Sequence, residues 1–274
     1  MDCKHDIYAS YTTLSEHTHN NEGEATTGIV QIAWSTISIV IENRLDSAKK
    51  IGMNRLFKNL KLNPKFLPLW QLLSPPFTFL ALSRLTLIEK TSKIKITGLD
   101  ELSQGGPYIF TNWHEHLPYL CHHHGRQGQR CMLMSPAPYM TPIDMWCRTT
   151  GLHVIRRSNS DIALVSLAEQ INPTPHSQSP PYSVVLAIDG PAGPPHVPKR
   201  GCIQLAQETG APIVHVNYTS ARGTPDLTRW DQWLWPVLAD DIHIHYSSPL
   251  RIPADVSLTE GTRMVQALAA SISS

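Results

Sequence analysis

Residues 185–201 read VLAIDGPAGPPHVPKRG, an apolar run that leads through a proline-rich loop into a helix-like segment. The run ends at the carboxylate of Asp189. Four prolines stand between Asp189 and the basic pair Lys199 and Arg200. A short apolar run bounded by turn residues is typical of a buried strand. The residues that follow, GCIQLAQETG, predict a helix that ends at Gly210. The stretch therefore predicts a strand, a stiff loop and a helix in succession, the repeating unit of α/β proteins.

The same alternation of strand and helix continues on both sides of this unit. Residues 93–98, KIKITG, alternate polar and apolar side chains as a half-buried strand does. Thr141 caps a predicted helix with Pro142 in its first turn, and Ser160 or Asp161 opens another. The chain thus predicts an α/β fold with a central, largely parallel sheet flanked by helices. The expected strands are 93–98, 108–110, 130–135, 152–158, 184–189, 212–218 and 241–252, and the expected helices are 141–151, 161–171, 199–210 and 259–272.

Two apolar segments precede the predicted sheet. Residues 28–41, GIVQIAWSTISIVI, are too short for a membrane span, which needs roughly 20 residues. In the second segment Pro75 and Pro76 are expected to separate two short helices, because proline removes a helical hydrogen bond. With basic residues between them, the two segments predict a helical region that lies on a membrane surface; a helical pair packed on the main domain is the alternative. The predicted organisation is a loose tail at 1–27, this helical segment at 28–90, an α/β domain at 91–255 and a C-terminal helix at 256–274.

The bulk composition excludes several classes of protein. The chain has 274 residues and a net charge of +1, which gives no electrostatic case for nucleic-acid binding. Only 16 % of the residues are charged, which suits either a protein that rests on an apolar surface or one with a large core. The five cysteines form no CxxC pair, and the polar N-terminus lacks the apolar core of a signal peptide. We therefore expect a reducing, cytosolic environment.

Polar side chains follow four of the predicted strands. In open α/β sheets ligands bind at the carboxyl ends of the strands, so we expect these side chains to form one site. They are Asn112 and His114 to His116 after the first such strand, Arg156 and Arg157 after the second, Asp189 to Pro191 after the third, and Asn217 and Tyr218 after the fourth.

Four sequence blocks in this order resemble the glycerolipid (lysophospholipid) acyltransferase superfamily, and most closely a bacterial branch of it. That branch has a Trp-His pair in the first block and Asp-Gly-Pro-x-Gly-Pro in the third. The resemblance covers roughly residues 94–253, and its blocks are Trp113-His114, residues 151–157, residues 189–194 and the run GCIQLAQETGAPIVHV. It implies a fold like that of glycerol-3-phosphate acyltransferase. It also implies transfer of a fatty acyl group from acyl-CoA or acyl-carrier protein to a hydroxyl of a lysophospholipid or related lipid, without a further cofactor, at the cytoplasmic face of the inner membrane.

The resemblance also implies roles for individual residues. His114 is the general base, since imidazole titrates near neutral pH. The candidates in this chain for the carboxylate that orients it are the adjacent Glu115 and, from another strand end, Asp189. The arginines of the second block bind phosphate on the acceptor or the donor, and the third block shapes the acceptor site beside a basic pair that attracts an anionic head group. The implied substrate-binding set is Asn112, Arg156, Arg157, Asp189, Gly190, Pro191, Lys199 and Arg200.

The chain departs from the superfamily at three positions. The widespread first block is His-x4-Asp, in which the Asp orients the base, but Tyr119 stands at that place. Ala192 replaces a residue that is usually basic in the branch, and His215 replaces a proline of the fourth block. These departures motivate an alternative function, a lipid-binding protein of the same fold without turnover.

A histidine-rich stretch motivates a third hypothesis. Residues 114–124 read HEHLPYLCHHH, and His243 and His245 share one face of a predicted strand. Imidazoles, a thiol and a carboxylate are zinc ligands, so a metal-dependent hydrolase is a further alternative, although no HExxH motif occurs. The aromatic run RWDQWLWP at 229–236 is expected to pack on the sheet edge or to line an acyl pocket or membrane interface.

Overall fold

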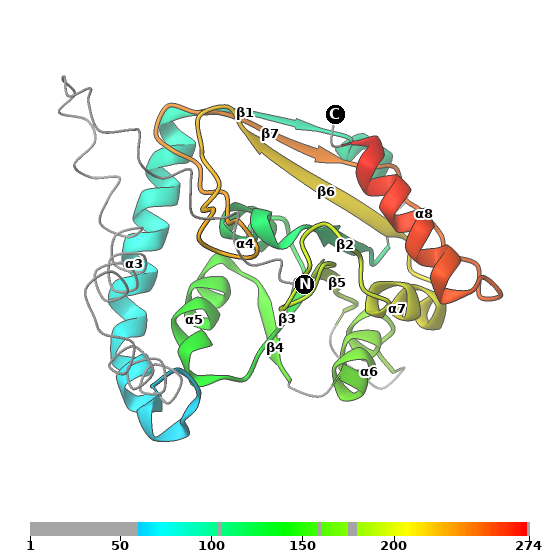
Figure 1. Ribbon diagram of the computed structural model, residues 1–274, viewed down its shortest axis with the longest axis horizontal. Coiled ribbons are helices and arrows are strands. Elements are labelled where there is room, and N and C mark those ends of the chain that lie inside the picture. Colours follow the sequence, from blue (N-terminus) through cyan, green and yellow to red (C-terminus); the bar gives the residue numbers. More distant parts are fainter. Residues whose placement is uncertain (1–59, 103–105, 158–159, 175–179, 273–274) are drawn as a thin grey trace, which may run out of the picture. The chain divides into compact units, whose positions relative to one another are not determined.

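A seven-stranded sheet lies at the centre of the part of the chain that the computed structural model describes, residues 60–102, 106–157, 160–174 and 180–272 (Figure 1). These residues all belong to a unit that spans Asp46–Ser274. The tail predicted at 1–27 and the apolar run at 28–41 lie outside the described residues. The strands are β1 (Lys93–Thr97), β2 (Ile109–Asn112), β3 (Arg130–Met134), β4 (His153–Arg156), β5 (Ser183–Ala187), β6 (Ile213–Ser220) and β7 (Asp241–Tyr246).

The strand order is β1-β7-β6-β2-β5-β3-β4, and most neighbours are parallel. β6, β2, β5, β3 and β4 pair in parallel, whereas β7 runs antiparallel to β6 and β1 runs parallel to β7. The predicted α/β class with a largely parallel sheet is therefore confirmed. The carboxyl ends of β2, β5 and β6 share one edge of the sheet, because these three strands are parallel neighbours.

Helices cover both faces of the sheet. Along β2 and β5, successive side chains point to opposite faces, so Phe110 and Val185 join one core cluster while Ile109 and Val184 join the other. The first cluster includes side chains of α3, α4 and α5, and the second includes side chains of α6, α7 and α8 (Figure 1). The helices are α3 (Leu67–Thr91), α4 (Leu117–Gly125), α5 (Thr141–Thr150), α6 (Ser160–Ile171), α7 (Gly201–Thr209) and α8 (Leu258–Ser271).

Helix α3 is continuous, which corrects the expectation that Pro75 and Pro76 separate two short helices. Both prolines are exposed and lie away from the buried stripe of the helix. Its buried residues form one stripe with spacings of three and four along the helix, which is a helical period. The stripe is Trp70, Ser74, Thr78, Ala81, Leu85 and Ile88. Burial of this stripe against α5 and the sheet outweighs the loss of two hydrogen bonds.

Two further local expectations are corrected. β1 is not half-buried: four of its five residues are exposed, with Ile94 at 37 % and Ile96 at 39 %, because no described element covers either face of this edge strand. Thr141 is the first residue of α5 rather than its cap, and its hydroxyl accepts a hydrogen bond from Arg156 at 3.4 Å. The predicted end of α7 is confirmed, since Gly210 follows it with φ +70°.

No helix among the described residues is long and apolar enough to cross a membrane.

Candidate active site

His114 lies immediately beyond the carboxyl end of β2, in a short 3-10 turn that leads into α4. The backbone N–H of His114 donates a hydrogen bond of 3.0 Å to Oδ1 of Asp189. Asp189 follows β5, whose Ala187 is paired with Asn112 at the end of β2. The structure therefore brings two of the residues predicted for the site, His114 and Asp189, into contact, because their strands are neighbours in the sheet.

Asp189 fixes the backbone of the site and does not contact the imidazole of His114. Its carboxylate is 1 % exposed and also accepts the backbone N–H of His196 at 3.4 Å. Burial raises the pKa of Asp189, and the charge of His114 and the two backbone N–H groups partly offset that rise. The carboxylate thus ties the turn after β2 to the proline-rich loop after β5.

The proline-rich loop folds back over the turn that carries His114. Gly193 has φ +62°, and a Cβ added to it would lie 2.6 Å from Cε3 of Trp230. His196, also with positive φ, places Nε2 2.9 Å from Oε1 of Glu115 and its ring 5.1 Å from that of Trp113. The proline-rich loop at 190–198 therefore covers the turn after β2 through contacts of Gly193 and His196.

A second carboxylate approaches the imidazole of His114 itself. Asp231, 2 % exposed, places Oδ2 4.0 Å from Nε2 of His114. The guanidinium of Arg229 donates two hydrogen bonds to the carboxylate of Asp231, from Nε to Oδ1 at 2.7 Å and from Nη2 to Oδ2 at 2.8 Å. Both residues belong to the loop between β6 and β7, and sequence reasoning missed them. The only signal was one aspartate inside the aromatic run RWDQWLWP.

The electrostatic surroundings favour the neutral form of His114. Burial lowers the pKa of His114, the charges of Asp189 and Asp231 raise it, and Arg229 lowers it, with burial the largest effect. The side chain is 20 % exposed, while its Nδ1 is buried and has no hydrogen-bond partner in the described part of the chain. The ring of Trp230 lies 5.2 Å from the imidazole. A neutral imidazole at this position can accept a proton from a hydroxyl group.

Glu115 contacts two other histidines. Its Oε1 lies 3.0 Å from Nε2 of His116 and 2.9 Å from Nε2 of His196. Burial raises the pKa of Glu115, but the hydrogen bonds and charges of His116 and His196 lower it by more. The net pKa of Glu115 therefore lies below its ordinary value. The backbone carbonyl of Glu115 accepts the N–H of Leu234 at 2.9 Å, which joins the β6–β7 loop to the turn.

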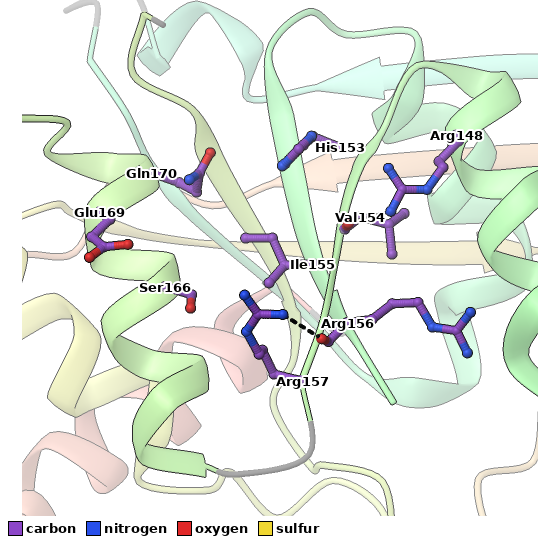
Figure 2. A pocket seen from close by; sticks show the side chains of 9 residues that line it. All are labelled: Arg148, His153, Val154, Ile155, Arg156, Arg157, Ser166, Glu169 and Gln170. Atoms are coloured by element: carbon purple, nitrogen blue, oxygen red, sulfur yellow. Dashed lines mark hydrogen bonds between the residues drawn. The ribbon is translucent and has the colours of Figure 1, made fainter. Parts of the chain in front are cut away.

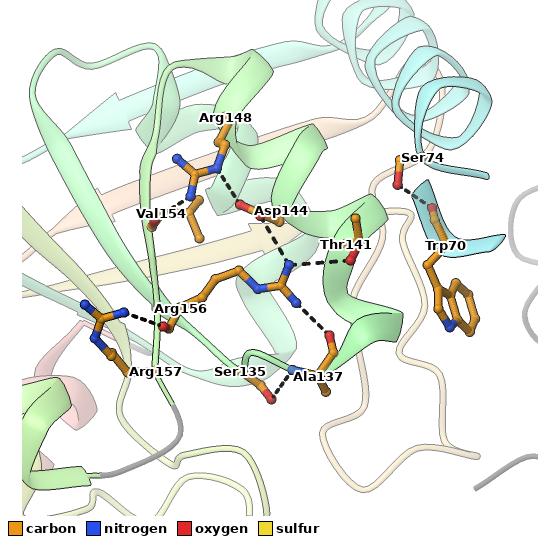
Figure 3. Close-up of polar contacts among 10 residues, drawn as sticks. All are labelled: Trp70, Ser74, Ser135, Ala137, Thr141, Asp144, Arg148, Val154, Arg156 and Arg157. Carbon is orange, nitrogen blue, oxygen red and sulfur yellow. Dashed lines mark hydrogen bonds and ion pairs between the residues drawn. The ribbon is translucent and has the colours of Figure 1, made fainter. Parts of the chain in front are cut away.

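Arg156, the last residue of β4, and Arg157, which follows it, lie three strand positions away from β2, about 14 Å at roughly 4.8 Å per strand. Arg156 donates to the carbonyl of Ala137 at 2.7 Å and to Oδ2 of Asp144 at 3.4 Å (Figure 3). Arg157 is exposed, and its guanidinium donates to the carbonyl of Arg156 at 3.1 Å. In the described residues no contact joins either arginine to His114 or Asp189.

A cavity of about 400 Å³ lies beside the two arginines (Figure 2). Figure 2 shows the guanidinium of Arg157 directed toward the cavity between β4 and α6, and that of Arg156 directed away toward α5. Its lining residues are Arg148, His153, Val154, Ile155, Arg156, Arg157, Ser166, Glu169 and Gln170.

The other residues predicted for the site have different environments. Asn112 is fully buried, and its amide donates to the carbonyl of Trp113 at 2.7 Å. Gly190, with φ +72°, packs against the aliphatic part of Lys199, whose Cγ would lie 3.3 Å from an added Cβ. Pro191, Lys199 and Arg200 are exposed.

The fourth strand end does not contribute to the site as expected. Asn217 and Tyr218 lie within β6, paired with residues of β7, rather than after it. Asn217 donates to the carbonyl of Ile272 at 3.0 Å, and Tyr218 stacks on Tyr119 with ring centroids 5.0 Å apart. The antiparallel partner β7 extends β6 beyond the point where its parallel neighbour β2 ends, so these residues belong to the core.

The histidines of α4 point to separate partners. His122 pairs with Glu89 at 3.3 Å, His123 contacts the hydroxyl of Tyr246 at 2.7 Å, and His124 contacts Arg130. Burial, with the charge of Arg130, lowers the pKa of His123 to about 3. In the described part of the chain no three His, Cys, Asp or Glu side chains are grouped so that they could hold a metal ion. The α4 histidines therefore serve packing and hydrogen bonding.

Comparisons with known proteins include a distant likeness to a solved structure. No family model matches the chain, and no curated protein matches it. Among solved structures the chain is similar to the 1-acyl-sn-glycerophosphate (LPA) acyltransferase PlsC from Thermotoga maritima, with 12 % sequence identity and a TM-score of 0.44. The match covers 82 % of this chain and 90 % of that chain.

Proposed function

We propose that the protein is an O-acyltransferase that moves a fatty acyl group from a thioester donor to a hydroxyl of a lysophospholipid or related lipid. One observation carries the proposal. His114 is a partly exposed imidazole at the carboxyl end of a central strand, with its backbone fixed by Asp189 and a carboxylate near Nε2. The sequence blocks around both residues support the same reaction.

In the proposed reaction His114 acts as the general base. Its accessible ring nitrogen takes the proton of the acceptor hydroxyl while the hydroxyl oxygen attacks the thioester carbonyl. The carbon–sulfur bond then breaks, and the imidazolium returns the proton to the leaving thiolate. The products are the ester and the free thiol of CoA or acyl-carrier protein. The proposed reaction needs no resident cofactor, and burial of His114 keeps the imidazole neutral and ready to accept a proton.

Exposed cations are available for the phosphates of the substrates. We assign Arg157 to phosphate binding, because its guanidinium faces the cavity of about 400 Å³. Arg156 is held by Asp144 and Ala137, so we assign it to shaping that cavity. Lys199 and Arg200, exposed beyond the proline-rich loop, supply positive charge for an anionic head group.

The outer face of α3 supports a further part of the proposal, attachment to the cytoplasmic face of the inner membrane. Leu72 is 73 % exposed and Phe79 is 70 % exposed on this helix. Apolar side chains on an exposed helix face favour the interface of a lipid bilayer. The other exposed large apolar residues of α3 are Leu69, Leu73, Leu80 and Leu87.

Acyl transfer by purified protein tests the proposal. Labelled acyl-CoA and acyl-carrier protein are supplied with mixed lysophospholipids and lipid A precursors, and wild type is compared with His114→Ala. His243→Ala, in which an imidazole bonded to Thr97 on β1 is lost, is the matched control. We expect ester product from wild type and the control and none from His114→Ala, whose fold is checked by circular dichroism.

The same assay distinguishes the alternative function. If His114→Ala forms product at the wild-type rate, the assignment of His114 as the base is refuted. Absence of product from folded wild type with every donor and acceptor, together with binding to lipid vesicles, would replace the enzyme by a lipid-binding protein. With product, Arg157→Glu is expected to raise KM for the phosphorylated substrate with little change in kcat.

A further inference from the structure

The chain lacks the carboxylate that a His-x4-Asp motif would supply to its base. The residue at that position, Tyr119, is 1 % exposed and stacks on Tyr218 in the core. An imidazole that accepts a proton needs a nearby negative charge to stabilise the imidazolium that forms. In this fold the negative charge must therefore come from another segment. Two carboxylates lie near His114, those of Asp189 and Asp231.

Their geometry separates the roles of the two carboxylates. The two carboxylate oxygens of Asp189 accept hydrogen bonds from backbone N–H groups, including that of His114 at 3.0 Å. Asp231 is the carboxylate near the ring, with Oδ2 4.0 Å from Nε2. We propose that Asp231, held by Arg229, is a positioning residue that stabilises the protonated ring of His114 beside the charge of Asp189, in place of the missing motif aspartate. The inference rests on the proposed acyl transfer and deepens it.

Asp231 is held rigidly, as a positioning residue must be. The guanidinium of Arg229 forms two hydrogen bonds with its carboxylate, and the same guanidinium lies 4.0 Å from the ring centroid of Trp233. The backbone N–H of Asp226 donates to the carbonyl of Trp233 at 3.0 Å, which closes the base of the loop. Because both oxygens of Asp231 are gripped by a planar fork, the carboxylate cannot rotate away from His114 without breaking a bond.

The loop is also attached to the turn that carries the base. The N–H of Leu234 donates to the carbonyl of Glu115, the residue after His114, at 2.9 Å. Trp230, next to Asp231, lies near both the imidazole of His114, with ring centroids 5.2 Å apart, and Gly193. The β6–β7 loop and the turn after β2 are therefore fixed to each other at several points, and the approach of Asp231 to His114 is part of a built structure.

The distance of 4.0 Å defines what Asp231 does. It is longer than a hydrogen bond, so the carboxylate does not share the proton of the neutral imidazole. When Nε2 takes the proton of the acceptor hydroxyl, the new positive charge lies 4.0 Å from a buried negative charge, where attraction is much stronger than in water. The proton remains on the imidazole until it returns to the leaving thiolate.

The test measures the basicity of His114 directly by NMR titration of the histidine rings. The His114 signal is identified by its absence in His114→Gln. The charged groups that face His114 are Asp189, Asp231 and Arg229. We expect Asp231→Asn to lower the pKa of His114 by about one unit, since one nearby charge is removed. The control Asp226→Asn removes a carboxylate of the same loop that bonds Thr228 instead, and it is expected to leave that pKa unchanged.

A second variant keeps the test decisive if Asp231→Asn disturbs the loop. Arg229→Gln removes the cation that lowers the pKa of His114, so the pKa is expected to rise. Loop disorder would move both variants in one direction, toward the value of an exposed histidine. Opposite shifts in the two variants support the inference, whereas unchanged values or shifts of the same sign overturn it.

The pH dependence of kcat/KM gives an independent readout. General-base catalysis falls off at acid pH as the base is protonated. For Asp231→Asn we expect the acid limb of the kcat/KM profile to move to lower pH by about one unit, because His114 becomes a weaker base. We also expect the plateau value of kcat/KM to fall about tenfold to a hundredfold, because the imidazolium that forms in the reaction is less stabilised. A lower plateau with an unmoved limb would overturn the role of Asp231. Opposite NMR shifts without acyl transfer by wild type would support the pairing of Asp231 with His114 and refute only the proposed reaction.

Discussion

Asp189 is expected to stabilise the fold through the two backbone N–H groups that it accepts. Asp189→Ala leaves the N–H of His114, bonded at 3.0 Å, and the N–H of His196, bonded at 3.4 Å, without their acceptor. Asp189→Asn keeps one oxygen as an acceptor but turns an amide donor toward the other N–H. Asp189→Ala therefore removes both acceptor oxygens, and Asp189→Asn removes only one of them.

The magnitude follows from these two bonds. A buried donor left without a partner costs about 1–3 kcal/mol, and the 3.4 Å bond contributes the smaller share because it is long. We expect Asp189→Ala to lower the free energy of unfolding by about 2–4 kcal/mol and Asp189→Asn by about 1–2 kcal/mol near neutral pH. Urea titration measures both, with a fall in midpoint of about 1 M for the larger effect. Asp255→Asn, at an exposed loop position, is the control and should change the free energy by less than about 0.5 kcal/mol.

The pH dependence of this effect has a defined sign. Burial raises the pKa of Asp189 above its ordinary value of 3.8, so the folded protein holds this proton more tightly than the unfolded chain. Its contribution to the free energy of unfolding is therefore fully present below pH 3.8 and is lost as pH rises through the raised pKa. The advantage of wild type over Asp189→Asn should shrink as pH rises above 3.8 and through the raised pKa of Asp189. Variants within 0.5 kcal/mol of wild type (about the error of the method), or an advantage that grows with pH, would refute the reasoning.

Two matched pairs test the packing. Gly193→Ala places a methyl group 2.6 Å from Trp230 at φ +62°, whereas Gly128→Ala meets no atom at φ +90°; we expect costs of about 2–4 and about 1 kcal/mol in urea titrations, and equal costs would mean that Trp230 moves freely. Leu85→Ala at a fully buried position of α3 should cost about 2–5 kcal/mol. Leu72→Ala on the exposed face should cost less than about 0.5 kcal/mol, so a large effect there would reveal a covering partner.

Much of the fold could be predicted because its signals are local. The apolar run of β5 and the helix that ends at Gly210 depend on period and on one positive φ, and both can be recognised in a short window of sequence. α3 shows where such reasoning fails. Its buried stripe has helical spacing, yet the rule for Pro75 and Pro76 suggested a break, and only packing decided that burial outweighs two lost hydrogen bonds.

The sequence alone determined which residues stand at the ends of strands, and hence that His114 and Asp189 were candidates for one site. Strand order alone made them neighbours, since contact requires that β2 and β5 pair in parallel. The approach of Asp231 had no local signal. It arises because the β6–β7 loop leaves the sheet at the edge where β2 ends, and because β7 then turns back antiparallel beside β6. Local periodicity depends on neighbours in sequence, whereas the partner of a catalytic side chain depends on which strands share an edge, and only the folded sheet decides that.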